Sequence, residues 1–172
     1  STTGFELSED TKICINKYKH LLFTPAKERI NYELMKLFGG HNCSKTLLVM
    51  DDFGILEELF PFVKEMKQVP PNTHHHLDLF HHVVETVRNI DELYLQSSKG
   101  EKEHLEATDF GGFPRLNHLK IAGFLHDIGK FSTWTIEEDT GRHRFIKHDD
   151  VGAKMCVPFL KDLKFSLPYL LR

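Results

Sequence analysis

Two adjacent polar residues, His126 and Asp127, stand near the end of an otherwise apolar stretch, residues 119–130. The apolar residues of this stretch leave almost no polar face: Leu119, Ile121, Ala122, Phe124, Leu125 and Ile128. The pattern predicts a buried helix that Gly129 ends as its C′ residue. A carboxylate buried beside an imidazole is costly unless something compensates its charge. A divalent cation bound by both side chains is the simplest compensation.

An isolated His-Asp pair also has a plainer interpretation. Asp127 would cap the turn that follows the helix, and His126 would offset the negative end of the helix dipole. Short motifs of this kind have many false positives. The remaining histidines of the sequence decide between the two interpretations.

A second helix offers a further metal ligand. The apolar pattern predicts a helix over residues 77–94, with His82 near the edge of its apolar face and His81 as its competitor. His82, His126 and Asp127 together offer nitrogen and carboxylate ligands suited to Mn, Fe, Co, Ni, Zn or Mg, with no thiolate to favour zinc. Such an ion lowers the pKa of bound water and holds a phosphoryl oxygen. These residues in combination favour a metal site.

Cationic and imidazole side chains follow the His-Asp pair. Lys130 comes directly after it, and His148 begins a later helix. We expect both to contact phosphate or to transfer protons, so the expected catalytic residues are Asp127, Lys130 and His148. Other basic residues nearby could offset phosphate charge: Arg142, Arg144 and Lys147. In the plainer alternative, Lys130 is only a cation at a helix end and His148 only the first residue of a helix. The other basic residues then belong to a solvated loop.

Composition narrows the class of protein. The 172 residues carry 22 basic and 25 acidic side chains, so the protein as a whole has no positive charge that would attract nucleic acid. This composition still allows a local basic patch. Three widely spaced cysteines without a Cys-x-x-Cys pair are typical of reduced thiols in a cytoplasmic protein. No apolar run approaches ~20 residues and no signal peptide opens the chain, so we expect no membrane partner. The cluster His74–His76 could be solvated or metal-binding.

The rest of the chain predicts an all-α fold, because no strands pair convincingly. We expect helices to start after the capping residues Ser8, Thr24 and Ser44, with Pro25 as the first helical residue after Thr24. Pro114 is expected to open the central helix. Residues 96–112 are expected to form a polar loop, and residues 131–147 an irregular segment with a short extended stretch through Trp134 and Ile136. A helix from His148 is expected to be interrupted by Pro158, and Ser166-Leu167-Pro168 is expected to start another.

Three motifs follow one another along the chain. His82 comes first, then Gly123-Phe-Leu-His126-Asp127-Ile-Gly-Lys130, then Phe145-Ile-Lys-His148-Asp-Asp-Val-Gly152-Ala153. Together they resemble the HD superfamily of metal-dependent phosphohydrolases. Within it the chain is most similar to the HD domain of bacterial CCA-adding and poly(A) polymerase-like nucleotidyltransferases. The resemblance implies an HD helical bundle and phosphomonoesters or (cyclic) phosphodiesters of nucleotides as substrates.

The segment before the HD motifs resembles the helical RNA-binding neck of the same nucleotidyltransferases. Its residues are Thr24-Pro-Ala-Lys-Glu28-Arg29-Ile30-Asn-Tyr-Glu33-Leu34-Met-Lys36-Leu37, followed by Asp52-Phe-Gly54-Ile-Leu56. We therefore expect a small helical neck over residues 1–67, a linker over 68–76 and an HD domain over 77–172. The alternative function is a non-catalytic RNA-binding body, in which basic residues follow tRNA or RNA phosphates. Those residues are Lys17, Lys19, Lys27, Arg29 and Lys36.

Two departures from the family pattern matter. The Gly-Ser and paired-carboxylate strand motif of a nucleotidyltransferase head is absent, so this chain is not expected to add nucleotides by itself. The final metal-binding Asp of the family lies on a later helix, and Asp162 is too close to His148 in the sequence for that role. We therefore expect a fragment of a longer protein with an incomplete metal shell, and the sequence leaves the activity of this fragment by itself open.

Overall fold

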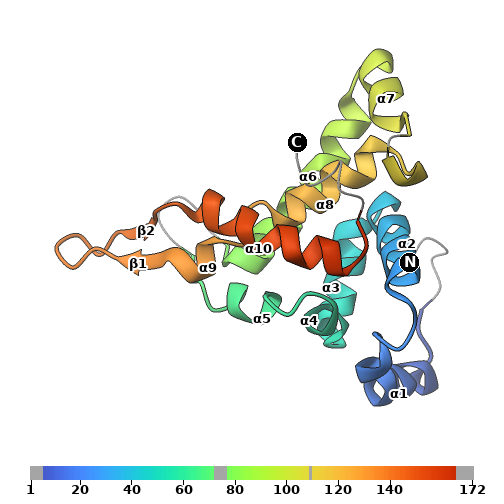
Figure 1. The fold of residues 1–172 in the computed structure, drawn as a ribbon, viewed down its shortest axis with the longest axis horizontal. Coiled ribbons are helices and arrows are strands. Elements are labelled where there is room, and N and C mark those ends of the chain that lie inside the picture. The colour runs from blue at the N-terminus through green and yellow to red at the C-terminus, as the bar shows by residue number, and fades with distance from the viewer. Residues whose placement is uncertain (1–5, 72–76, 109, 166–172) are drawn as a thin grey trace.

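Figure 1 shows the protein as a computed structural model, in which residues 6–71, 77–108 and 110–165 are described. The elements follow in this order: α1 (Glu9–Tyr18), the 3₁₀ helix η1 (Lys19–Leu21), α2 (Lys27–Gly39), α3 (Cys43–Asp52), α4 (Ile55–Leu59), α5 (Val63–Met66), α6 (Leu79–Gln96), α7 (Lys99–Glu106), the 3₁₀ helix η2 (Phe110–Gly112), α8 (Arg115–Leu125), α9 (Lys130–Thr133), β1 (Trp134–Ile136), β2 (His143–Phe145) and α10 (His148–Asp162). The predicted helical bundle is confirmed.

Helices α6 and α8 form the centre of the molecule, and α2 and α3 pack against them from the N-terminal part of the chain. Aromatic side chains join these parts into a single core. The ring of Phe124 on α8 lies 5.9 Å from that of Phe38 on α2 and 5.1 Å from that of Phe60, centroid to centroid. Burying rings of this size is a main source of folding free energy, so α8 is held firmly along its length.

Buried polar contacts fix the start of α8 against α2. The side chain of Asn117 donates to the Met35 carbonyl oxygen at 2.9 Å. Lys120 is fully buried, pairs with Asp91 of α6 and donates to the Gly40 carbonyl oxygen at 3.0 Å. Buried ions are tolerated only when paired and hydrogen-bonded. These contacts therefore fix the relative position of α2, α6 and α8.

Two predicted helix starts are wrong, although Ser8 does cap α1 by accepting from the Thr11 N–H at 3.2 Å and Pro114 directly precedes α8. Helix α2 begins at Lys27, after Ala26, and Thr24-Pro25 belongs to the preceding turn. Ser44 lies inside α3 and is buried, because the N-cap of that helix is Asn42. Asn42 is as good an N-cap residue type as Ser44, so residue type alone did not separate the two possible starts of α3.

The segment predicted as a loop over residues 96–112 contains helix α7. Ser98 and Glu101 form a reciprocal capping box, in which each side chain bonds the backbone of the other residue. The sequence carries this Ser-x-x-Glu signature, but the polar composition of the segment concealed it.

Pro158 does not interrupt α10, contrary to the prediction. A proline inside a helix costs about 3 kcal/mol. The residue after it compensates, because the ring of Phe159 packs 5.5 Å from Phe60 and 5.3 Å from Phe62.

Residues 131–147 are more regular than predicted, although the extended stretch expected through Trp134 and Ile136 is confirmed as β1. They contain α9 and a small antiparallel sheet, in which Trp134 pairs with Phe145 and Ile136 with His143. Arg144 donates to Glu137 at 2.8 Å and braces the hairpin, which projects from the bundle at the left of Figure 1. The second strand, β2, was not predicted, because three residues carry too little alternation to be recognised.

Some predictions lie outside the described residues, namely those on residues 1–5, on His74–His76 and on Ser166-Leu167-Pro168. Within the described residues, no helix is both long and apolar enough to cross a membrane. The three cysteines, Cys14, Cys43 and Cys156, are all free thiols, as expected.

We predict that Lys120→Met destabilises the protein by about 3 kcal/mol, because it leaves the Asp91 carboxylate without its buried partner. The loss is measured by urea unfolding, with Lys154→Met on the exposed side of α10 as the control. The double variant Lys120→Met/Asp91→Leu should recover much of this loss. Equal stability of Lys120→Met and the control would contradict the role given to this ion pair.

Candidate metal centre

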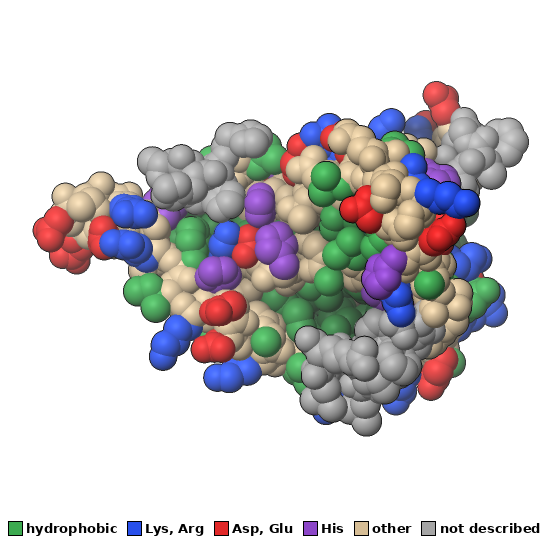
Figure 2. Space-filling model, turned by 90° about the horizontal axis from the view of Figure 1, so that it is seen from above, with side chains coloured by type: hydrophobic (Ala, Val, Ile, Leu, Met, Phe, Trp, Pro, Cys, Tyr) green, Lys and Arg blue, Asp and Glu red, His purple; other side chains and the backbone are tan. Residues whose placement is uncertain are grey.

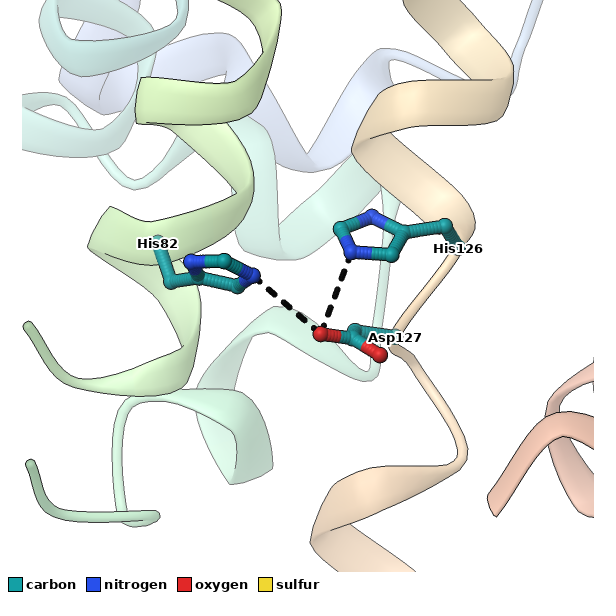
Figure 3. Close-up of side chains that lie close together, drawn as sticks. All are labelled: His82, His126 and Asp127. Atoms are coloured by element: carbon teal, nitrogen blue, oxygen red, sulfur yellow. Dashed lines mark ion pairs between the residues drawn. The ribbon is translucent and has the colours of Figure 1, made fainter. Parts of the chain in front are cut away.

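The ends of two helices bring the three predicted metal ligands together, as Figure 3 shows. His82 projects from the first turns of α6, and His126 and Asp127 follow the last residue of α8. The Oδ2 atom of Asp127 lies 3.2 Å from Nε2 of His82 and 3.1 Å from Nε2 of His126. One ligand atom from each residue falls within 4.8 Å of the others. A single ion can therefore contact all three.

The structure distinguishes His82 from its neighbour His81. The ring of His81 is turned to the start of α6, where its Nδ1 lies 2.7 Å from Oδ2 of Asp78. Asp78 also caps α6 by accepting from the backbone N–H of His81 at 3.0 Å. His81 thus belongs to the helix cap, and His82 faces Asp127.

Backbone carbonyls orient two imidazole rings at the site. Nδ1 of His126 donates to the Gly123 carbonyl oxygen, and Nδ1 of His148 donates to the Phe145 carbonyl oxygen, each at 2.8 Å. A carbonyl can only accept, so the proton sits on Nδ1 and Nε2 is the atom turned to Asp127. Metal-bound histidines are commonly oriented in this way by a hydrogen bond from the other ring nitrogen.

Lys130 and His148 complete the surroundings of the Asp127 carboxylate. Nζ of Lys130 lies 2.6 Å from Oδ2, and Nε2 of His148 lies 3.5 Å from Oδ1. The Asp127 side chain is 5% exposed, whereas His126 is 41% and His148 34% exposed. The carboxylate is therefore buried, while one side of the site is open to a ligand.

Electrostatics at the site favour the ionised carboxylate. Burial alone would raise the pKa of Asp127, but hydrogen bonds from His126, His82 and Lys130 outweigh burial and hold this pKa far below its usual range. The hydrogen bond to Asp127 in turn raises the pKa of His126 above its ordinary value, against the effect of burial. The site is thus built for positive charge around one fixed negative charge.

The chain leaves α8 earlier than predicted. Helix α8 ends at Leu125, and a turn leads to α9 at Lys130. Gly129 has φ −68° and is not a left-handed C′ residue. Leu119, predicted to be buried, is 44% exposed. The early end of the helix turns Asp127 inward and leaves His126 at the surface.

Gly129 is needed for close packing of α9 against α10. A Cβ atom at this position would lie 1.9 Å from the His148 carbonyl oxygen and 2.6 Å from the Gly152 backbone nitrogen. The close approach brings His148, the first residue of α10, within reach of Asp127. This role was not predicted from the sequence, although Gly129 and Gly152 were its signal.

The other basic residues lie along the hairpin and beyond it. Arg144 is paired with Glu137, while Arg142 and Lys147 are exposed. Asp162 lies at the far end of α10 and pairs with Lys27 of α2 at 3.0 Å, so it is not a part of this site. On the face shown in Figure 2, histidine side chains gather beside acidic and basic ones over the middle of the molecule.

We predict that Gly129→Ala destabilises the protein by about 2 kcal/mol or more, because the new Cβ meets backbone atoms that cannot move aside cheaply. Gly152→Ala is the matched comparison, since its nearest contact would be 3.2 Å from the Gly129 nitrogen. Urea unfolding measures both variants. A smaller loss for Gly129→Ala than for Gly152→Ala would show that the crossing is not tight.

Two family models match the chain. The model described as the HD domain matches residues 79–170, and one described as "Probable RNA and SrmB- binding site of polymerase A" matches residues 4–67. The chain is 31% identical over 140 residues to the A-adding tRNA nucleotidyltransferase of Deinococcus radiodurans. This alignment covers 81% of this chain and 28% of that protein. It is 25% identical over 170 residues to the CC-adding tRNA nucleotidyltransferase of Thermus thermophilus, covering 96% of this chain and 35% of that protein.

The chain thus spans about a third of the length of these two relatives. The HD model covers more than half of the chain, including all the side chains gathered around Asp127. The helical bundle and the His-Asp pair at the end of α8 agree with that match. The chain belongs to the HD domain family.

Proposed function

We propose that this chain is a metal-dependent phosphohydrolase domain acting on phosphomonoesters or on linear or cyclic phosphodiesters of nucleotides. The observation that carries the proposal is the approach of His82, His126 and Asp127 to within 4.8 Å of one another. Two imidazole nitrogens and one carboxylate form a ligand set suited to Mn, Fe, Co, Ni, Zn or Mg. An ion held there would lower the pKa of a bound water and polarise a phosphoryl oxygen.

The remaining residues have roles that follow from their positions. Asp127 supplies the fixed negative charge that the cation needs. His148 presents Nε2 to the site from its open side, so it contacts the phosphate or gives a proton to the leaving group. Lys130 adds positive charge next to the carboxylate and favours an anionic substrate.

Substitution of the ligands tests this function directly. His126→Ala and Asp127→Ala should lower turnover of p-nitrophenyl phosphate and bis-p-nitrophenyl phosphate at least about 100-fold in the presence of Mn, Ni or Mg. His81→Ala is the matched control, since that ring points away from Asp127. Equal turnover by Asp127→Ala and the parent would refute the proposal.

Metal affinity should rise with pH. In the metal-free site, His126 can donate to both Gly123 and Asp127 only as the imidazolium ion, which is why its pKa is raised. A metal ion takes the place of the proton on Nε2, so binding releases it. Titration calorimetry with Mn²⁺ should show weak binding below this raised pKa and tighter binding as pH increases through it. An affinity that is constant between about pH 5 and 8 would contradict this assignment.

We also propose that the N-terminal part of the chain contacts RNA, tRNA in particular, as part of a tRNA nucleotidyltransferase-like protein. The match of residues 4–67 and the two relatives support this role. Of the basic residues predicted to contact RNA, Lys17, Arg29 and Lys36 are exposed. Lys19 instead donates to the Phe53 carbonyl oxygen, and Lys27 pairs with Asp162. RNA binding is proposed alongside the hydrolase site and not in its place.

Salt dependence tests the RNA surface. Arg29→Ala/Lys36→Ala should weaken binding of a tRNA transcript and reduce the slope of log K against log salt by about 1 to 2, since each lost phosphate contact removes about 0.7 to 0.9. Lys154→Ala on α10 is the control for a general charge effect. An unchanged slope in the double variant would exclude these two residues from the RNA surface.

A further inference from the structure

Lys130 holds its charge inside the protein, whereas Lys147 is exposed. The side chain of Lys130 is 10% exposed, and its Nζ lies 2.6 Å from Oδ2 of Asp127. This is the same oxygen that faces His82 and His126. The ammonium group also lies over the ring of Phe145, 5.5 Å from its centroid. Lys130 is thus held against the metal-binding oxygen, inside the protein.

The charges of these groups cancel without a metal when both imidazole rings are neutral. Asp127 contributes −1 and Lys130 contributes +1. With neutral rings on His82 and His126, these four side chains therefore have no net charge. A divalent cation would give this set a net charge of +2 in a partly buried place. Like charges a few ångströms apart repel strongly there, because little water screens them. An anion bound at the open side would reduce that repulsion.

We propose that Lys130 is a positioning residue that weakens binding of the bare metal ion and thereby makes tight metal binding depend on an anionic ligand. This inference rests on the proposed function, because it needs a metal at His82, His126 and Asp127. The carboxylate oxygen has two lone pairs, so Lys130 can keep its hydrogen bond while the other lone pair serves the ion. The binding of metal and anion would then be positively coupled, each increasing the affinity for the other by the same factor.

The sign of the effect separates this role from a merely structural one. Removing a residue that only supports Asp127 would weaken metal binding. Removing a repelling charge would strengthen it. Lys130→Met should therefore bind Mn²⁺ about 10-fold more tightly than the parent, or more. Lys130→Arg, which keeps the charge, and Lys154→Met, which removes an exposed charge from α10, should both stay within about threefold of the parent.

Titration calorimetry of the metal-free chain with Mn²⁺, with and without sulfate, performs the test. Sulfate should tighten Mn²⁺ binding to the parent, and this enhancement should be smaller for Lys130→Met. If the parent binds no Mn²⁺, Ni²⁺ or Mg²⁺ with or without sulfate, the proposed function fails and the inference fails with it. If the parent binds metal and Lys130→Met binds it equally or more weakly, the inference alone is overturned.

A folding defect would not block the test. If Lys130→Met unfolds without metal, thermal unfolding of Lys130→Met and of Lys130→Gln is followed as Mn²⁺ is added. Stabilisation at a lower Mn²⁺ concentration than half-saturates the parent supports the proposal. Absence of stabilisation at concentrations that saturate the parent overturns it.

Discussion

The buried carboxylate of Asp127 is the constraint on which the rest of the site depends. A negative charge with 5% exposure is stable only if positive or hydrogen-donating groups surround it. Four side chains from α6, α9, α10 and the turn after α8 meet this need. The same arrangement also suits the carboxylate to the proposed role of a metal ligand, because the two imidazole nitrogens beside it are ligands that a divalent cation accepts.

Helix α8 links this site to the N-terminal part of the chain. Its first turns carry Asn117 and Lys120, which bond backbone oxygens at the end of α2, and its far end leads to His126 and Asp127. Between them, Phe124 packs against rings from both parts of the core. The distance between the two regions is therefore fixed by one helix and by buried contacts, not by flexible connections.

The sequence predicted the features that depend on residue type and spacing over a few turns. The apolar pattern located the helix that carries His82 and the helix that ends just before the His-Asp pair, because buried faces repeat every turn. It failed where tertiary packing decided: Pro158 is carried inside α10 by the packing of Phe159, and Gly129 serves a backbone contact rather than a helix end. Nor could it show that Lys130 points at Asp127, since that direction depends on the early end of α8.

The contact between Gly129 and Gly152 also limits how this scaffold can be redesigned. Two backbones touch there, so no side chain can be introduced at residue 129 without moving the first turn of α10. The hairpin tip, by contrast, is braced by its own residues, Glu137, Thr140 and Arg144. A redesign can therefore vary the loop between β1 and β2 but has to leave Gly129 unchanged.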